Sequence, residues 1–464
     1  MSDDGYLQRF RRQGDIVVVG ASLTGLRAAE ALRDEGFTGT ITMVGDEPHE
    51  PYDRPPLSKQ VLLGLVPPDH TALPRTRDID AKWRLGVAAT GLDLAGKRVR
   101  LSDGDTLDYD RLLITTGVRA RPWPNPMEAQ LDGVFVLRTR DDAARLHHRL
   151  KAGPRRVLVI GAGFTGSEIA SACRERGLAV TVAERGPSPL VGALGGVVGA
   201  VATELHRAHG VDLRCGVQVT GLEGDPAGRV RKAHFSDGES VEAEVVVVCL
   251  GATRNTEWLA DSGLGAGPRG IACDAGCRAF DVRGIVTDDV FVAGDVARSP
   301  HPLFGYQFLS LEHWGNAVAQ AQIAAHNMVS ASAERRPHLW MPSFWSAQFG
   351  VNIKSVGVPP MADQIVVTQG SLADHRFTAA YGHQGRVIAA VTFDQAKWLD
   401  FYERQIERAA SFPPEPPNVD RRPEGLQPVP AGFPDPSVPS HGPSVTLSGH
   451  SPTDRRITFT PTRA

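Results

Sequence analysis

The sequence predicts an α/β protein that contains two copies of a strand–glycine loop–helix–strand unit and ends in a small α+β domain. In one copy, an apolar run of four residues leads into Gly161, Gly163 and Gly166, and apolar side chains then recur at helical spacing. The same order of elements begins at residues 16–25, and short strand-like segments alternate through residues 342–410. Together these observations predict two buried parallel sheets and a separate strand-rich domain.

The glycine loop after the apolar run 157–160 has the features of a phosphate-binding turn. Glycines let the backbone bend tightly, let a pyrophosphate approach the free N–H groups of the helix, and let the helix pack closely on the strand. The next strand, 179–183, ends in Glu184, which is placed to accept hydrogen bonds from both ribose hydroxyls of an adenine dinucleotide. We interpret this stretch as a complete Rossmann-like dinucleotide-binding unit.

The earlier copy differs from the later one at two positions. Its loop contains Gly20, Ser22 and Gly25, so a serine replaces the middle glycine. Its acidic residue, Asp46, comes one residue later than Glu184 does in the other copy. One GxGxxG-like string is weak evidence, but two complete units predict two bound nucleotides, a flavin and a nicotinamide dinucleotide.

Both units close on a further apolar strand that ends in glycine. The first closing strand ends at Gly117 and the second at Gly251, and each follows an Asp-Gly hairpin signal. The two units therefore form an internal repeat of about 140 residues. We expect the chain to cross between domains at these two glycines.

Composition and charge exclude several function classes. Of 464 residues, 41% are hydrophobic and 22% charged, which is typical of a globular protein. The net charge of -3 provides no field that would recruit nucleic acid or an anionic membrane. Neither a membrane-spanning run nor an apolar targeting segment is present, so a cytoplasmic location is expected.

The cysteines indicate neither a disulfide framework nor a metal centre. They are five in number and scattered, and no spacing among them completes a metal site. Flavoenzymes that reduce disulfides through a protein thiol carry that cysteine soon after the first dinucleotide helix, whereas the first cysteine here is Cys173. We therefore expect no thiol chemistry.

Two later segments carry candidate flavin contacts. An apolar strand ends in Gly294 and Asp295, whose carboxylate can accept a hydrogen bond from a sugar hydroxyl. A long helix begins near Glu312, and its N-terminus can stabilise negative charge on a reduced flavin ring. His313 is either an acid–base residue or a merely packed histidine. Lys59 likewise is either a solvated helix-surface lysine or part of the site.

The carboxy-terminal part divides into a folded domain and a tail. Within the domain we expect Trp345 and Phe349 to anchor the core. The tail, residues 411–464, holds 13 of the 34 prolines and shows little apolar periodicity, so it is predicted to be disordered.

At this point the motifs identify a family. The chain resembles the NADH-dependent ferredoxin reductases of oxygenase systems, of the putidaredoxin reductase and biphenyl dioxygenase reductase type, over residues 14 to about 410. The resemblance rests on the strings Gly20-Ala-Ser-Leu-Thr-Gly25, Pro51-Tyr-Asp-Arg-Pro-Pro-Leu-Ser-Lys59, Thr115-Thr-Gly117, Gly161-Ala-Gly-Phe-Thr-Gly166, Ala293-Gly-Asp295, Glu312-His-Trp314 and Phe344-Trp-Ser346. The Arg-Pro-Pro-Leu-Ser-Lys and Phe-Trp-Ser strings are specific to that group, whereas the glycine motifs occur in all flavoproteins with two dinucleotide folds.

The resemblance implies a glutathione reductase-like arrangement of domains. It predicts an FAD-binding domain split into residues 1–120 and 254–330, an NAD-binding domain at 121–253, a reductase domain at 331–410 and the tail at 411–464. It also implies FAD contacts from Thr24, Asp46, Lys59, Ala89, Arg138, Asp295 and Trp314, in addition to the glycine positions. Lys59 is then expected beside the isoalloxazine and near Glu168, where the pair would take part in catalysis.

The resemblance further implies that NADH passes a hydride to FAD and that single electrons then reach an iron–sulfur ferredoxin serving an oxygenase. NADPH is disfavoured as the donor because Glu184 would repel its extra phosphate, although Arg185 could blunt this preference. Two departures leave the acceptor open: Phe308-Leu309-Ser310 stands where relatives carry arginine, and Ala347 stands where they carry aspartate.

Two other functions therefore stay open. One is an NADH:quinone or small-molecule oxidoreductase, and the other is a flavoprotein whose redox state controls binding to a partner. The chain is expected to be a monomer or homodimer.

Overall fold

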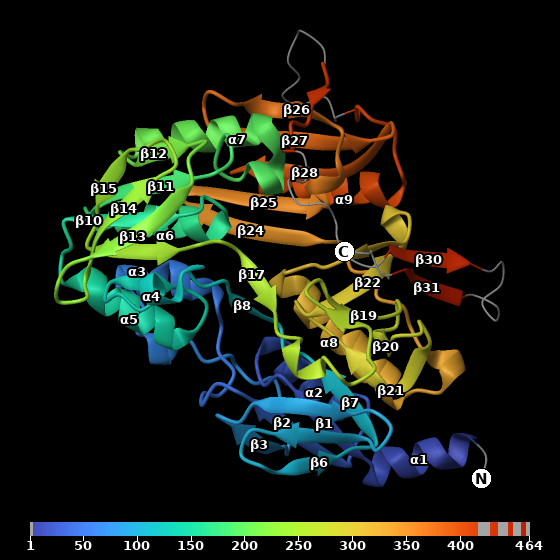
Figure 1. The fold of residues 1–464 in the computed structure, drawn as a ribbon. Helices are drawn as coiled ribbons and strands as arrows, with labels where there is room; N and C mark the ends of the chain where they lie inside the picture. Colours follow the sequence, from blue (N-terminus) through green and yellow to red (C-terminus); the bar gives the residue numbers. More distant parts are fainter. Residues whose placement is uncertain (1–2, 416–426, 435–443, 449–455, 461–464) are drawn as a thin grey trace.

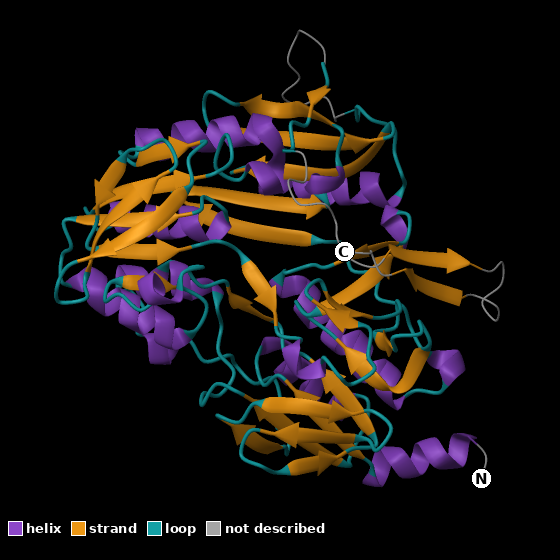
Figure 2. Ribbon diagram, in the orientation of Figure 1, coloured by secondary structure: helices purple, strands orange, loops and turns teal. Residues whose placement is uncertain are grey.

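The chain folds into two α/β units and a carboxy-terminal antiparallel sheet domain (Figure 1; Figure 2). This computed structural model describes residues 3–415, 427–434, 444–448 and 456–460. The predicted fold class is confirmed, because two mainly parallel sheets and the smaller domain form in the expected order.

The first unit is built on a six-stranded sheet with the order β20-β21-β7-β1-β2-β3. Its strands are β1 (Asp15–Val19), β2 (Thr40–Gly45), β3 (Lys82–Leu85), β7 (Arg111–Ile114), β20 (Arg278–Phe280) and β21 (Val286–Val292). All neighbours are parallel except β20 and β21. Since β20 and β21 come after the second unit in the chain, the first unit is assembled from two separate segments.

The second unit contains a five-stranded parallel sheet with the order β12-β11-β10-β16-β9. Its strands are β9 (Val134–Val136), β10 (Arg156–Ile160), β11 (Ala179–Glu184), β12 (Asp212–Cys215) and β16 (Val245–Val248). Each unit also carries a three-stranded antiparallel sheet: β4 (Ala89–Asp93), β5 (Arg98–Leu101) and β6 (Thr106–Asp108) in the first, and β13 (Val219–Gly224), β14 (Val230–Phe235) and β15 (Ser240–Glu242) in the second. The internal repeat is therefore visible in both sheets.

Helices cover the sheets through faces rich in small apolar residues. The helices are α1 (Asp3–Gln13), α2 (Leu23–Asp34), α3 (Gln60–Leu63), α4 (Pro126–Ala129), α5 (Arg140–Lys151), α6 (Phe164–Glu175), α7 (Val191–Ala208), α8 (Trp314–Val329) and α9 (Leu399–Glu407). Ala28 and Ala29 of α2 and Ala321 and Ala324 of α8 are fully buried in one cluster, so these two helices approach closely on the first sheet. Among the residues that the structure describes, every helix is too short or too polar to cross a membrane.

The carboxy-terminal domain is a six-stranded sheet with the order β24-β25-β28-β27-β26-β29, and α9 packs on β28. Its strands are β24 (Ser343–Gln348), β25 (Val351–Gly357), β26 (Gln364–Ser371), β27 (Arg376–His383), β28 (Arg386–Phe393) and β29 (Val429–Pro430). Leu194 and Val198 of α7 lie in the same buried cluster as Ile353 and Tyr381 of this sheet. The Tyr381 hydroxyl also donates to the Leu194 carbonyl at 2.6 Å. The second unit and this domain therefore share one core.

The first and second units are joined by a narrow ribbon. Its strands, β8 (Val118–Ala120) and β17 (Ala252–Arg254), pair antiparallel directly after Gly117 and Gly251. Both glycines have positive φ angles, +61° and +86°, at the points where the chain leaves each unit. A four-stranded sheet beside the first unit comprises β18 (Ala266–Gly267), β19 (Gly270–Ala272), β22 (Ala297–His301) and β23 (Gln307–Leu309).

The prediction of a disordered tail is wrong for residues 427–434. Strand β29 pairs with the edge of β26, the Ala431 amide donates to the Asp363 carbonyl at 3.0 Å, and the Ala431 carbonyl accepts from the Gly196 amide at 2.8 Å. Gly195 breaks the regular geometry of α7 here, so this carbonyl satisfies an amide at the start of a helical segment. Composition cannot reveal such partners, because they lie on distant parts of the fold.

Two further strands follow in the tail, β30 (Ser444–Ser448) and β31 (Arg456–Thr460), and they pair antiparallel. For residues 416–426, 435–443, 449–455 and 461–464 the disorder prediction lies outside the described residues.

Candidate functional site

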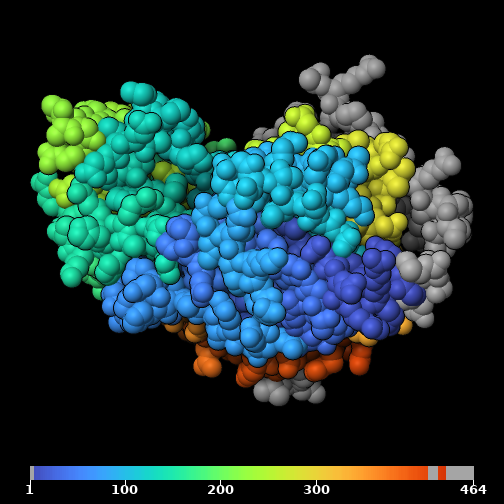
Figure 3. All heavy atoms as spheres, turned by 90° about the horizontal axis from the view of Figure 1, so that it is seen from below, coloured from blue at the N-terminus to red at the C-terminus, as the bar shows by residue number. Residues whose placement is uncertain are grey.

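A cavity of about 720 Å³ opens at the carboxyl ends of β1, β2 and β7, where residues of both α/β units and of β24 meet. Its volume lies in the usual range of ligand sites, and open α/β sheets bind ligands at this edge. In Figure 3 the second unit stands out as a lobe beside the first. The residues predicted from the sequence that line the cavity are Gly20, Ser22, Thr24, Asp46, Lys59, Ala89, Gly117, Arg138, Glu168, Asp295 and Trp314.

The first glycine loop brings the N-terminus of α2 to this cavity. Gly20 has a φ angle of +119°, which side-chain-bearing residues rarely adopt, and a Cβ at Gly25 would overlap the Gly20 carbonyl oxygen. Ser22 precedes α2 without capping it through its side chain, so the first amides of the helix are left for a ligand. Gly294 closely approaches Thr24, where a side chain would not fit. Such a terminus favours a phosphate group.

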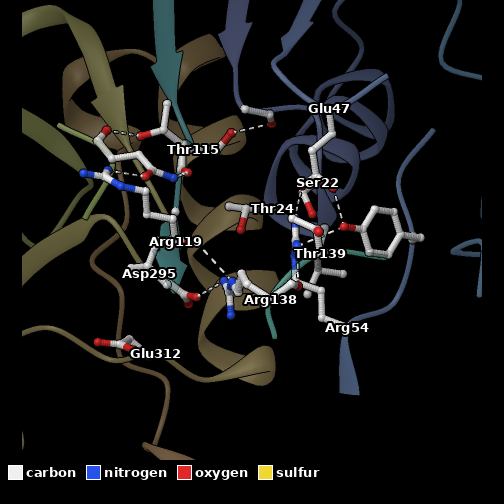
Figure 4. Close-up of a pocket in the computed structure, with 18 of the residues that line it drawn as sticks. Ser22, Thr24, Glu47, Arg54, Thr115, Arg119, Arg138, Thr139, Asp295 and Glu312 are labelled. Atoms are coloured by element: carbon white, nitrogen blue, oxygen red, sulfur yellow. Dashed lines mark hydrogen bonds and ion pairs between the residues drawn. The ribbon is translucent and has the colours of Figure 1, made fainter. Parts of the chain in front are cut away.

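Ion pairs arrange the polar walls of the cavity. Figure 4 shows Arg138 and Asp295 pointing toward each other, and their closest nitrogen and oxygen atoms are 3.1 Å apart. On the other wall the Arg54 guanidinium donates to the Glu47 carboxylate at 2.6 Å and to the Arg138 carbonyl at 2.8 Å. Glu47 also accepts from the Tyr52 hydroxyl, and burial raises the pKa of that phenol. Glu47 is therefore held by the protein, which leaves its neighbour Asp46 as the better candidate for a ribose.

Two buried polar atoms on the cavity wall have no protein partner among the described residues. They are His313 Nδ1, at the N-terminus of α8, and the indole nitrogen of Trp258. Burial lowers the pKa of His313 to about 4, so the imidazole is neutral at pH 7. Buried polar groups are normally hydrogen-bonded, and each of these two atoms can bond a polar ligand. With the open helix terminus and the ion pairs, they make the residues present a fit for FAD.

Lys59 and Glu168 come together as the resemblance implied. Their closest atoms, Nζ and Oε2, are 2.7 Å apart, and the two side chains are 18% and 9% exposed. Ser58 donates to the same carboxylate oxygen at 2.6 Å, and Ser346 donates to Oε1 at 2.6 Å. The alternative of a merely solvated Lys59 is therefore wrong. Its place beside a flavin ring stays a prediction.

Phe164 and Thr165 of the second glycine loop line this cavity, whereas Gly161, Gly163 and Gly166 do not. A Cβ at Gly166 would overlap the Gly161 carbonyl oxygen, whereas the space around Gly163 is open to a distance of 4 Å. The Glu184 carboxylate accepts from the Ala162 amide at 2.7 Å and from the Gly186 amide at 2.6 Å. Each carboxylate oxygen keeps a further lone pair, so Glu184 can still accept hydrogen bonds from the hydroxyls of a ribose, as predicted.

Sequence reasoning misplaced one aromatic residue and missed several polar ones. Phe349 is buried as predicted, but Trp345 is 47% exposed and lines the cavity, with its ring centroid 6.2 Å from that of Trp314. Trp345 faces outward because side chains alternate along β24, and its neighbour Ser346 takes the buried face. The strings that contain Ser58 and Ser346 singled out these serines, but nothing in the sequence revealed their shared partner.

The cysteines of the described chain take no part in the cavity wall. Burial raises the pKa values of Cys173 and Cys249 to about 12, so both thiols stay protonated and unreactive at neutral pH. Within the described residues, no group of three or more histidine, cysteine or acidic side chains is arranged to hold a metal ion.

Comparisons with known proteins agree with this geometry. Residues 14–321 match the pyridine nucleotide-disulphide oxidoreductase family, and residues 343–418 match the reductase C-terminal family. The chain is 35% identical, over 89% of its own length and 98% of the relative, to the ferredoxin–NAD(+) reductase component of an anthranilate 1,2-dioxygenase system from Burkholderia cepacia. It is also 35% identical, over 76% of its length and 83% of the relative, to the corresponding component of a biphenyl dioxygenase system from Paraburkholderia xenovorans.

Among solved structures, the chain is similar to the covalent putidaredoxin reductase–putidaredoxin complex. The TM-score is 0.79 and the identity 30%, and the match covers 86% of this chain and 94% of the other.

Proposed function

The chain belongs to the pyridine nucleotide-disulphide oxidoreductase family and, within it, to the ferredoxin–NAD(+) reductases of oxygenase systems, and on this premise we propose that it uses FAD to transfer electrons from NADH to an iron–sulfur ferredoxin. That ferredoxin in turn serves an oxygenase. The observation that carries the proposal is the Lys59–Glu168 pair beside a cavity that lacks cysteine among its described residues. Electrons then leave the flavin without a protein thiol as an intermediate carrier.

The residues of the cavity bind and orient the flavin. The N-terminus of α2 would hold the pyrophosphate, Asp46 the ribose, and the Arg138–Asp295 pair the chain between phosphate and ring. Bound FAD supplies the chemistry, because it accepts a hydride and gives up electrons one at a time. Lys59 would place a positive charge where negative charge develops on the ring, and Glu168 would keep that ammonium in position.

Trp345 provides the surface through which an acceptor would approach. It lines the cavity and is also 47% exposed, so a docked partner would be separated from the cavity by this side chain.

The arginine that is missing before Glu312 is partly replaced by basic residues that lie nearby in space. The guanidinium of Arg298 lies 5.5 Å from the ring centroid of Phe308, and the guanidinium of Arg254 pairs with the Glu312 carboxylate at 2.5 Å. Basic residues therefore occur beside this segment, although they come from elsewhere in the sequence.

The donor would be NADH because of Glu184. Its carboxylate is fixed by two backbone amides next to the second glycine loop, and a 2′-phosphate would meet that negative charge. Comparable kcat/KM values for NADH and NADPH would contradict this preference.

The predicted oligomeric state, monomer or homodimer, is tested separately by light scattering of the holoenzyme.

The apolar exposed Trp345 also favours a second candidate, direct reduction of a quinone. The decisive experiment is stopped-flow reduction of the FAD-loaded protein by NADH, followed by mixing with a panel of [2Fe–2S] and [3Fe–4S] ferredoxins or with a quinone. Rapid reoxidation by one ferredoxin supports the proposal. Rapid reoxidation by the quinone alone would refute it and establish the second candidate.

A further inference from the structure

Three parts of the chain meet at one carboxylate. Glu168 lies on α6 of the second unit, Ser58 and Lys59 come from the first unit, and Ser346 comes from β24 of the carboxy-terminal domain. All three donors lie 2.6–2.7 Å from a carboxylate oxygen. Lys59 and Ser58 share Oε2, whereas Ser346 is the donor to Oε1 among the described residues.

The contact between β24 and α6 has a matched register. On the helix, Phe164, Glu168 and Ser171 follow the i, i+4, i+7 spacing that places side chains on one face. On the strand side, Phe344 packs on Phe164 with ring centroids 4.6 Å apart, and the Phe349 amide donates to Ser171 Oγ at 2.7 Å. The Ser346–Glu168 bond lies between these two contacts, so the position of the serine hydroxyl is set on both sides.

The hydroxyl is also oriented by its own neighbours. Ser346 is 2% exposed, so water does not replace it, and Gln348 donates to its oxygen at 3.2 Å. The hydroxyl therefore accepts a hydrogen bond from Gln348 and donates its single proton to Glu168. A carboxylate held at both oxygens cannot rotate away from Lys59, because rotation would break a short bond at Oε1.

We propose that Ser346 is a positioning residue for the Lys59–Glu168 pair, so that the carboxy-terminal domain sets the orientation of the charged groups beside the flavin. Ser346 does not line the cavity, so it would act through Glu168. This inference rests on the proposed function for its kinetic consequence, but its effect on the reduction potential of the bound flavin does not require NADH.

The test compares Ser346→Ala with three other variants of the holoenzyme. Ser355→Ala is the matched control, because Ser355 is buried in the adjacent strand and its hydroxyl has no hydrogen-bond partner in the described structure. Ser58→Ala removes a donor from Oε2, which keeps Lys59, so it should have the smaller effect. Ser346→Thr keeps the hydroxyl and should restore the wild-type behaviour.

For Ser346→Ala we expect flavin reduction at saturating NADH to slow about tenfold, with the dissociation constant of NADH unchanged. We also expect the midpoint potential, measured by reductive titration with a reference dye, to become more negative, by about 30 mV if the equilibrium shifts tenfold. The visible absorption of bound FAD and the thermal midpoint identify any loss of folding.

Wild-type rate and potential in folded Ser346→Ala would overturn the proposal, as would a change confined to NADH affinity or an equal effect of Ser355→Ala. If NADH fails to reduce even the wild-type protein, the proposed function is wrong. The potential difference between wild type and Ser346→Ala then decides the positioning role alone.

Discussion

Replacing Lys59 by methionine tests whether its charge acts on the flavin. The substitution removes a cation 2.7 Å from Glu168 and leaves a 9% exposed carboxylate with two neutral serine donors. Breaking a fully buried ion pair from one side costs about 3–5 kcal/mol. Because Lys59 is 18% exposed, we expect a smaller loss of stability, about 2 kcal/mol.

The expected kinetic effect is larger than this loss of stability. Removing one fixed donor aimed at developing charge slows an enzyme by about 10²–10³-fold. We therefore expect the Lys59→Met holoenzyme to be reduced by NADH about a hundredfold more slowly in stopped-flow at saturating NADH. The double variant Lys59→Met with Glu168→Gln should regain thermal stability, since it leaves no isolated charge, but should stay slow.

Lys97→Met is the matched control for this substitution. Lys97 pairs with Asp289 at 2.5 Å on the surface, with 45% and 26% exposure, and such pairs contribute about 0–1 kcal/mol. Wild-type reduction kinetics are expected for this variant. An unchanged reduction rate in Lys59→Met would refute the role assigned to the lysine, and a slow double variant that also stays unstable would refute the charge argument.

Three further predictions concern the second unit and the tail. Gly163→Ala should weaken NADH binding in calorimetry and leave the thermal midpoint unchanged, because the protein leaves open space at this position. Gly166→Ala should lower the thermal midpoint, because its Cβ would overlap the Gly161 carbonyl. The reverse pattern would contradict the assignment of the loop. Burial lowers the pKa of His206 to about 4, so the unfolded chain binds an extra proton between about pH 6.5 and 4, and the stability of the fold falls as the pH decreases through that window. The variant His206→Leu should therefore show a smaller fall of the thermal midpoint between pH 7 and 5. An unchanged fall would exclude this histidine as its cause. Deleting residues 427–464 should expose the edge of β26 and speed proteolysis near Gly195 without changing the flavin spectrum. Deletion of residues 444–464 alone is the control. Equal proteolysis of the two deletion variants would show that β29 does not stabilise this part of the fold.

The two repeated units can be predicted from local signals in the sequence. Apolar runs, helical spacing and glycines that allow a positive φ angle act over a few residues, so they predict β10, α6 and β11 and their counterparts around Gly20 without knowledge of the rest. The string that ends at Lys59 is also a continuous segment, so the family resemblance alone could predict that Lys59 lies near Glu168.

How those segments meet depends on contacts between residues that are far apart in the sequence. Ser58 and Ser346 are 110 and 178 residues from Glu168, and no local pattern encodes such contacts. Its large aromatic side chain predicts that Trp345 lies in the core, but the alternation of side chains along β24 gives the buried face to Ser346. The composition of the tail likewise predicts disorder, whereas its order at Ala431 comes from hydrogen bonds to the edge of β26 and to the broken helix α7. In each case the deciding partner lies far away in sequence, and only the packed fold brings it within hydrogen-bonding distance.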